Sequence, residues 1–409
     1  MTDRANRSRE EPRDEWGVLA VPVDEPPPTE VATEEDQRAA SLADQSVPDD
    51  GSPPGQPPAG QPPPGPPGGR IFSLEGRPAP SLYLIGWLGS AAGLAIVAVA
   101  LLSGSPSVAP LIALIGICVL TIGLSVAAGY QLVARASRPA YAYRGPSPLI
   151  IFGVVLGLST VLSFALGLIG LRSDEPAGFL IALGVVAATY LLVVGLFLVR
   201  TGVLRWSEMG WLGWPVGTRY GAARLLGDVA YAVALMVPTL LLALILAAIL
   251  SQLLGVLPTQ ILPDAVTGGD RILILVAAAI LAPIGEELFF RGFALTAWLR
   301  DLGPRGALIR ASMLFAIVHI ANVDVAPGQA GVGLAQALIQ FAVILPVGTV
   351  LGVLFLQRGM VAAIAGHMAY NGLGLLLYLA GRSVAGAGRG RKAKRPRHAS
   401  RRQGAAKST

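Results

Sequence analysis

The sequence predicts an all-α protein, a polytopic bundle of about eight or nine transmembrane helices. Of its 409 residues, 53% are hydrophobic and only 14% are charged, whereas a soluble domain carries about 25% charged residues. The apolar residues also gather in repeated runs of roughly 20, the length that a helix needs to cross a bilayer. A soluble protein with one large core would not divide its apolar residues into so many separate runs.

Nine apolar runs account for the predicted spans. They cover residues 82–103, 109–133, 149–171, 178–199, 228–256, 272–298, 305–321, 330–356 and 360–381. We expect the first four runs and an interfacial loop to form an N-terminal region at residues 81–225. We expect the last five runs to form a core at residues 226–382.

The two ends of the chain differ in composition from the spans. Residues 1–80 are first acidic and polar, and then, at residues 53–69, almost entirely Pro, Gly and Gln. Such a segment cannot bury enough apolar surface to offset the entropy of ordering, so we expect it to be disordered. A proline-rich docking segment is the alternative. The basic residues 383–409 are expected to form a second disordered tail.

Arginines are concentrated in alternate loops of the predicted bundle. They follow the second, fourth and sixth runs, at Arg135, Arg138, Arg144, Arg200, Arg205, Arg219, Arg224, Arg300, Arg305 and Arg310. The positive-inside rule makes these loops and the N-terminus cytoplasmic. Nine spans then place the basic tail on the opposite face, so either one span is miscounted or the tail breaks the rule.

The charges and the cysteine content limit the partners. The formal net charge is +6, and the basic residues lie in loops and in the tail, where we expect them to meet anionic lipid headgroups. No nucleic-acid partner is expected. The single cysteine, Cys118, excludes a disulfide framework.

Residues 206–214 contain three tryptophans and are expected to lie in the cytoplasmic interface. Substrate docking is the alternative role of this segment.

Three charges interrupt the sixth apolar run. They are Glu286, Glu287 and Arg291, and a charged side chain at the bilayer centre costs about 2.5–3.5 kcal/mol or more. Glu287 and Arg291 are four residues apart, with the acid first, so they can pair on one helix face. Glu286 is rotated by about 100° from Glu287. We therefore expect a structural Glu287–Arg291 pair and a Glu286 carboxylate left for chemistry; the alternative ties both acids to Arg291.

Two histidines fall within later apolar runs. Phe315 and His319 are four residues apart on one face, as are His367 and Asn371 on another. Small residues surround the second pair and would allow close helix approach in a membrane. We expect both histidines to approach Glu286, in the middle or the cytoplasmic half of the membrane, in a site open to the cytoplasm. Hydrogen bonding between helices is the alternative role for His367 and Asn371.

These pairs resemble the three motifs of the CPBP family, also called ABI, which includes type II CAAX prenyl proteases and bacterial bacteriocin-processing or self-immunity proteins. The motifs are Glu286-Glu287-x-x-x-Arg291, Phe315-x-x-x-His319 and His367-x-x-x-Asn371, and the resemblance covers about residues 226–382. It implies an intramembrane endopeptidase that acts on a peptide or membrane protein. Glu286 would be the general base for a water held with His319, while His367 and Asn371 would stabilise the oxyanion. Glu287, Arg291 and Phe315 would support them.

Two questions stay open at this point. The family is also described as metalloproteases, and Glu286, His319 and His367 could hold a catalytic zinc with water as the fourth ligand. No cofactor is required by the metal-free scheme, which we favour slightly because no His-Glu-x-x-His segment is present.

The second question is the function itself. The rival functions are a proton-coupled transporter, which needs polar residues along the whole bundle, and a non-catalytic membrane scaffold. We expect the protein in the plasma membrane of a bacterium.

Overall fold

The structure, a computed structural model, is a bundle of long helices. It describes residues 73–74, 77–78, 80–102, 107–211, 219–259, 262–323 and 329–393. Within these ranges, eight helical segments are long and apolar enough to cross a membrane. The chain is therefore an all-α, integral multi-pass membrane protein, as predicted. A disordered tail was expected at residues 1–80, and residues 1–72 of it lie outside the described residues.

The helices follow the predicted runs closely. A hairpin of two short strands, β1 (Ser73–Leu74) and β2 (Arg77–Pro78), precedes them. The helices are α2 (Pro80–Leu102), α3 (Ala109–Ala134), α4 (Pro148–Leu168), α5 (Pro176–Val194), α6 (Arg219–Leu254), α7 (Gly268–Val276), α8 (Ala282–Glu287), α9 (Thr296–His319), α10 (Ala330–Arg358) and α11 (Met360–Ala393). Wider π-helical turns extend or join some of them, at η1 (Gly195–Val199), η2 (Ala277–Leu281) and η3 (Leu288–Leu295), and a 3-10 turn, η4 (Ile320–Asn322), follows α9.

One helical segment, Gly268–Asn322, contains two arms. Its 55 residues would make a straight helix about 80 Å long, whereas the hydrocarbon core is about 30 Å thick. Gly303 breaks the helix with φ 71° and ψ 176°, a conformation that glycine tolerates because it has no side chain. Pro304 then opens the next arm, where its missing N–H costs nothing. The eight described segments therefore hold nine arms, in agreement with the nine predicted runs.

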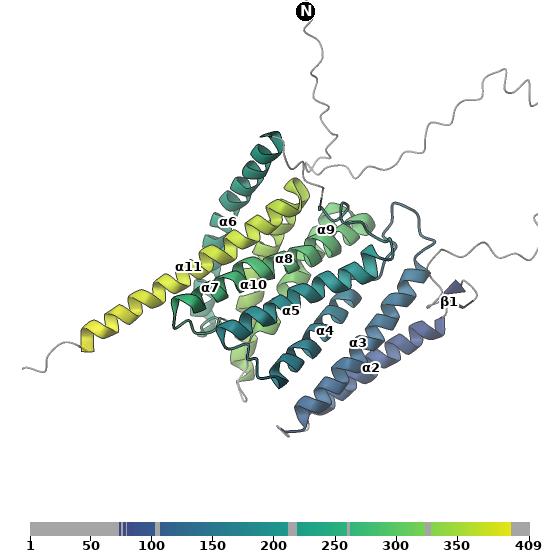
Figure 1. Cartoon of the computed structure of the whole chain (residues 1–409), viewed down its shortest axis with the longest axis horizontal. Coiled ribbons are helices and arrows are strands. Elements are labelled where there is room, and N and C mark those ends of the chain that lie inside the picture. Colours follow the sequence, from purple (N-terminus) through teal and green to yellow (C-terminus); the bar gives the residue numbers. More distant parts are fainter. Residues whose placement is uncertain are drawn as a thin grey trace, which may run out of the picture.

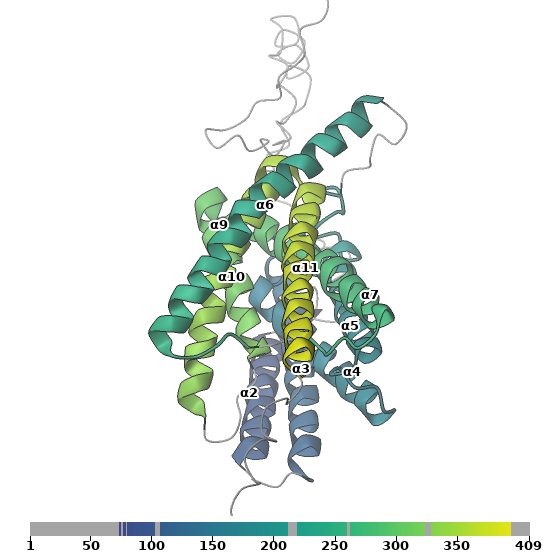
Figure 2. The ribbon, with the colours of Figure 1, turned by 90° about the vertical axis from the view of Figure 1, so that its left-hand side faces the viewer.

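The arms are arranged as a broad stack. Figure 1 shows the hairpin of α2 and α3 at one edge, followed by α4 and α5, with α8 and α11 further on and α6 at the other edge. Figure 2 shows α6 crossing obliquely over α10 and α11, and α6 packs against both of these helices. Along the stack, α8 lies between α5 and α11 and contacts both of them.

The α2–α3 hairpin is held together by glycines. A Cβ on Gly93 would lie 2.3 Å from the backbone nitrogen of Leu120, and one on Gly123 would lie 2.5 Å from that of Ser90. The two backbones therefore touch, as expected for small residues between membrane helices, where close van der Waals packing replaces the hydrophobic effect. This hairpin joins the rest of the stack through α4.

The last helix is longer than the sequence indicated. We expected the final span to end near residue 381 and a disordered tail from residue 383, but α11 continues as a helix to Ala393. Residues 383–393 contain Ala, Arg and Lys, which favour helices, but also three glycines, which disfavour them. Helix propensity therefore does not explain this extension. With nine arms, the C-terminal end of α11 lies on the face opposite to the start of α2. The structure thus retains the predicted conflict between a basic tail and the positive-inside rule.

A charged cluster ties α6 to the turn between α10 and α11. Asp228 on α6 lies 3.2 Å from Nη1 of Arg358 and 4.0 Å from Nε of Arg224. The guanidinium of Arg358 also lies over the ring of Tyr231, 4.8 Å from its centre. Because Arg358 precedes Gly359, which has φ 83°, the cluster fixes the place where α11 begins.

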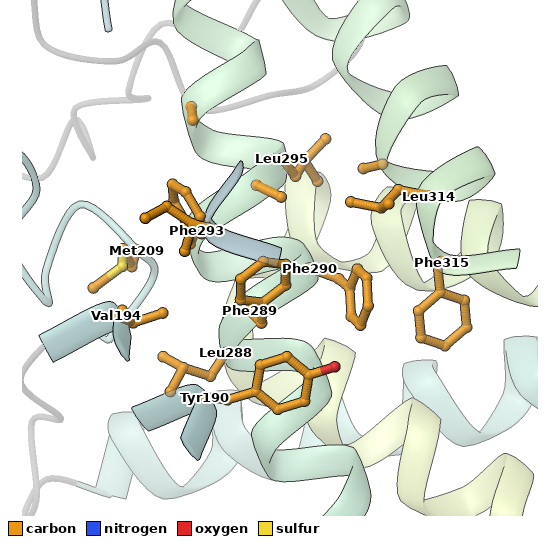
Figure 3. Close-up of a cluster of buried hydrophobic side chains, with 14 of the residues drawn as sticks. Tyr190, Val194, Met209, Leu288, Phe289, Phe290, Phe293, Leu295, Leu314 and Phe315 are labelled. Carbon is orange, nitrogen blue, oxygen red and sulfur yellow. The ribbon is translucent and has the colours of Figure 1, made fainter. Parts of the chain in front are cut away.

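The best-packed part of the core surrounds α8 and η3. Figure 3 shows Phe289 and Phe290 between Tyr190 of α5 and Phe315 of α9, with Phe293 packed edge-on against Phe289. All eight residues of η3 are buried, which explains why this stretch tolerates few polar side chains. The charged residues Glu287 and Arg291 lie inside this apolar packing, so they must find partners within the protein.

Candidate active site

The reversal at Gly303 brings the Glu pair opposite His319. Glu286 precedes Gly303 by 17 residues and His319 follows it by 16, so the two side chains meet across an antiparallel helix hairpin. Closer to the turn, the rings of Phe290 and Phe315 pack edge to face with their centres 5.1 Å apart. The register of the hairpin is therefore fixed by apolar packing, and the polar pair follows from it.

Two π-helical segments flank the carboxylates. The segments η2 and η3 directly precede and follow α8, whose last two residues are Glu286 and Glu287. Wider turns of this kind leave backbone carbonyls available and are frequent at functional sites. Here the amide of Asn371 donates to the carbonyl of Ala278 in η2 (2.8 Å), and the hydroxyl of Thr296 donates to the carbonyl of Arg291 in η3 (3.2 Å).

Glu287 and Arg291 form the expected ion pair. Nη1 of Arg291 donates to Oε1 of Glu287 at 2.7 Å, and the two side chains are 1% and 0% exposed. The same guanidinium donates through Nη2 to the carbonyl of Gly348 at 3.1 Å and lies 4.3 Å from the centre of the Phe315 ring. The arginine thus connects η3 to both α9 and α10 in the interior of the bundle.

Glu287 has a second partner that the sequence did not reveal. Its Oε1 lies 2.8 Å from Nδ1 of His367, which is 80 residues away on α11. A carboxylate only accepts hydrogen bonds, so Nδ1 carries the proton in this contact. The acid that we expected to serve Arg291 alone therefore also sets the orientation and the tautomer of His367. Spacing along one helix could not show this contact because it joins two helices.

His319 is oriented in the same way by its own helix. Its Nδ1 lies 2.7 Å from the carbonyl oxygen of Phe315, which again requires a proton on Nδ1. The Phe315 ring also packs against both imidazoles, with ring centres 4.5 Å from His319 and 5.7 Å from His367. Phe315 therefore positions both histidines, through its backbone for one and through its ring for both.

Glu286 lies between the two histidines. Its Oε2 is 3.8 Å from Nε2 of His319 and 3.8 Å from Nε2 of His367. This oxygen is buried and has no hydrogen-bond partner, although the side chain as a whole is 21% exposed. In the neutral imidazoles both Nε2 atoms are acceptors, because both Nδ1 atoms are protonated. Three acceptors therefore converge with no donor between them.

Asn371 makes its hydrogen bond outside the group formed by Glu286, His319 and His367. It lies one helical turn beyond His367 on α11, and its amide nitrogen donates to Ala278 rather than to Glu286. An amide group has two N–H bonds, so a second one remains for another acceptor. The roles of all four predicted catalytic residues stay predictions.

By chemical type, the side chains of Glu286, His319 and His367 are suitable metal ligands. A carboxylate oxygen and two imidazole Nε2 atoms, each imidazole held through Nδ1, match the donor set of catalytic zinc sites and their supporting hydrogen bonds. Their spacing of 3.8 Å exceeds the separation of roughly 3.4 Å between two ligands of a tetrahedral zinc. In the described ranges, no group of three or more His, Cys, Asp or Glu residues has the spacing of a metal site. The donors would have to approach one another by a few tenths of an ångström.

Comparison with known proteins agrees with the motifs. No characterised protein and no solved structure matches the chain. Residues 268–373 match a family model described as "Type II CAAX prenyl endopeptidase Rce1-like". This segment begins with α7 and ends after Asn371, so it contains all three motifs and lies within the core expected at residues 226–382. The predicted resemblance is confirmed over residues 268–373, which are similar to Rce1-like type II CAAX prenyl endopeptidases. This similarity suggests protease activity in a membrane.

Proposed function

We propose that the protein is an intramembrane endopeptidase that hydrolyses a peptide bond of a peptide or membrane-protein substrate near the cytoplasmic side of the membrane. The observation that carries this proposal is the position of Glu286 Oε2, buried, without a hydrogen-bond partner and 3.8 Å from two imidazole nitrogens. A buried polar group left unpaired costs about 1–3 kcal/mol or more. Such an unpaired group needs an explanation, and a role in the reaction is the one that we propose.

A water molecule suits the place where the three acceptors meet. Water has two O–H bonds, and it could donate one to Glu286 and one to Nε2 of His319 or His367. Glu286 then acts as the general base, removing a proton as the water oxygen attacks the substrate carbonyl. His319 orients this water, since its own ring is held by the Phe315 carbonyl.

In the proposed scheme, His367 and Asn371 stabilise the oxyanion. Nε2 of His367 can donate to an oxyanion only when the ring carries a second proton, because Nδ1 already donates to Glu287. The second N–H of Asn371 supplies a further donor.

A metal would use the same side chains. Glu286, His319 and His367 would hold a zinc ion, and Glu287 would support its ligand His367. A bound zinc supplies Lewis acidity and lowers the pKa of a bound water. Metal analysis of the purified protein and activity after chelation distinguish the two schemes. Full activity in a metal-free preparation contradicts the zinc scheme, and loss of activity that returns on adding zinc contradicts the metal-free one.

The test of the proposed function is a cleavage assay in reconstituted membranes with a peptide library. We expect wild-type protein to cleave a subset of peptides and His319→Ala to lose about 100-fold or more of that activity, the range typical of a general acid–base group. Arg310→Gln, at an exposed position on the same helix, is the control for the effect of any substitution in α9. Equal cleavage by wild type and His319→Ala contradicts the proposal.

A further inference from the structure

An apolar groove lies on the other side of the helix that carries the Glu pair. Its volume is about 540 Å³, within the range of roughly 300–1,000 Å³ that is usual for ligand sites. It is formed by α5, by the segment around α8 and by the loop that follows η1. The lining residues are Gly184, Ala187, Ala188, Leu191, Trp206, Trp211, Leu281, Ile284, Gly285 and Leu288.

The groove is separate from the candidate active site. Leu281, Gly285 and Leu288 follow one another at intervals of four and three residues, so they share one helix face. Glu286 is rotated by about 100° from Gly285 and about 200° from Ile284, which turns it away from that face. A molecule in the groove therefore packs against the back of α8 and does not replace the substrate at Glu286.

The groove is lined by apolar residues along its length, and one of its ends lies at a loop that carries arginines. Along α5 it runs from Gly184 to Leu191, a rise of about 10 Å, toward the arginine-rich face of the bundle. At that end lie Trp206 and Trp211, both about one-third exposed. Arg200 and Arg205, also exposed, lie in the same loop region. Tryptophan and arginine together are typical of the level of lipid headgroups. The opposite end, at Gly184 and Leu281, is lined only by apolar residues.

We propose that this groove binds one anionic glycerophospholipid. An acyl chain lies between α5 and α8, and its phosphate lies near Arg200 and Arg205, on the face that the positive-inside rule makes cytoplasmic. The chemistry of both ends agrees with this occupant, since the apolar part takes a hydrocarbon chain and the arginines take a negative headgroup. This proposal assigns Trp206 and Trp211 a lipid contact in place of the simple interfacial role expected from the sequence.

Native mass spectrometry of the full chain in a mild detergent tests the proposal. The probes are phosphatidylglycerol and phosphatidylcholine with the same acyl chains. We expect one phosphatidylglycerol per chain to be retained in preference to phosphatidylcholine. Gly184→Leu should remove this retention, because a side chain at this position meets no atom closer than Leu281 Cδ1 at 3.9 Å and extends into the groove. Gly167→Leu, on α4 where a Cβ meets nothing within 4 Å, should retain the lipid.

The headgroup contact is tested with substitutions that leave the groove intact. Arg205→Gln should weaken retention of phosphatidylglycerol about fivefold, the effect of one arginine near a membrane surface. Arg310→Gln, another exposed arginine of the same face, should not. If Gly184→Leu does not fold, Ala188→Leu in the same lining replaces it.

Three outcomes overturn the inference. They are equal retention of the two lipids by wild type, unchanged retention by a folded groove-filling variant, or a variant that raises KM for a cleaved peptide while its lipid retention is unchanged. The last would assign the groove to substrate. Because lipid retention does not depend on catalysis, failure of this proposal and failure of the proposed protease function give different results.

Discussion

Two charged clusters join helices in this bundle, and the negative charges in them are balanced to different degrees by arginines. At the candidate site, Glu286 and Glu287 share one arginine, Arg291, in surroundings where the ion pair is at most 1% exposed. At the α6–α10 contact, Asp228 has two arginines within 4.0 Å, and the side chains of Arg358 and Arg224 are 46% and 59% exposed. The first cluster has two carboxylates for one arginine, and its ion pair is buried. The second has one carboxylate for two arginines, and both arginines are partly exposed to solvent.

Under the proposed function, the difference separates an ion pair that only holds helices together from a cluster that takes part in a reaction. Around Asp228, one carboxylate oxygen accepts from Arg358 at 3.2 Å and the other lies 4.0 Å from Arg224. Around Glu286 the buried Oε2 has no hydrogen-bond partner. In Glu287, Oε1 accepts from both Arg291 and His367, while Oε2 is also without a partner. Within one motif, the acid with two partners holds the helices together, and the proposed mechanism assigns the other acid to the reaction.

The largest expected effect is on catalysis, from Glu286→Gln. The amide has nearly the same shape but cannot take a proton from water, so cleavage should fall by about 10²–10⁴-fold, while the midpoint of thermal unfolding stays close to that of the wild type. Peptide cleavage in reconstituted membranes and unfolding of the purified protein measure the two effects. Glu175→Gln, exposed in a loop, is the matched control. A fully active Glu286→Gln protein would refute the proposed mechanism.

The next effect is on folding, from Glu287→Gln. This change leaves the charge of Arg291 buried and weakens the contact with His367, and breaking one side of a buried ion pair costs about 3–5 kcal/mol. We expect a large fall in the unfolding midpoint, measured by the fraction of protein that remains monodisperse after heating. Stability equal to that of the wild type would show that Glu287 is not needed to hold Arg291.

A double substitution distinguishes the two partners of Glu287. Replacing Glu287 and Arg291 together by Leu and Met removes both buried charges, and such replacements are often neutral for stability. We expect stability to recover relative to Glu287→Gln, while cleavage stays low because His367 has lost the acceptor at Nδ1. Recovery of both properties would mean that orientation of His367 by Glu287 has no part in catalysis.

The smallest effect is expected at the second cluster, from Asp228→Asn. Its arginine partners are partly exposed, so the loss in stability should be about 1 kcal/mol or less, with cleavage little changed. Arg224→Gln, whose contact with Asp228 is 4.0 Å, is expected to stay within about 0.5 kcal/mol of the wild type. Loss of cleavage in a stable Asp228→Asn protein would instead place this cluster among the residues that position α11.

Much of the local structure follows from the sequence because helical spacing is a local property. The nine apolar runs correspond to the nine helical arms. The pairs at four-residue spacing, such as Glu287 with Arg291, lie on common faces. The length of α11 was underestimated because hydropathy marks only the apolar part of a helix, whereas α11 continues to Ala393. The π-helical turns around α8 have no signal in residue spacing, since they depend on the packing of neighbouring helices.

The sequence by itself determined the membrane class, the number of helical arms and the residues of the three motifs, since each depends on composition or on spacing within one helix. Only the tertiary structure decided that Glu287 serves both Arg291 and His367, that Glu286 faces two imidazoles from different helices, and that Trp206 and Trp211 border a groove behind α8. These contacts join residues tens of positions apart. Their geometry is set by how the helices pack and by the reversals at Gly303 and Gly359, which no periodicity along the chain encodes.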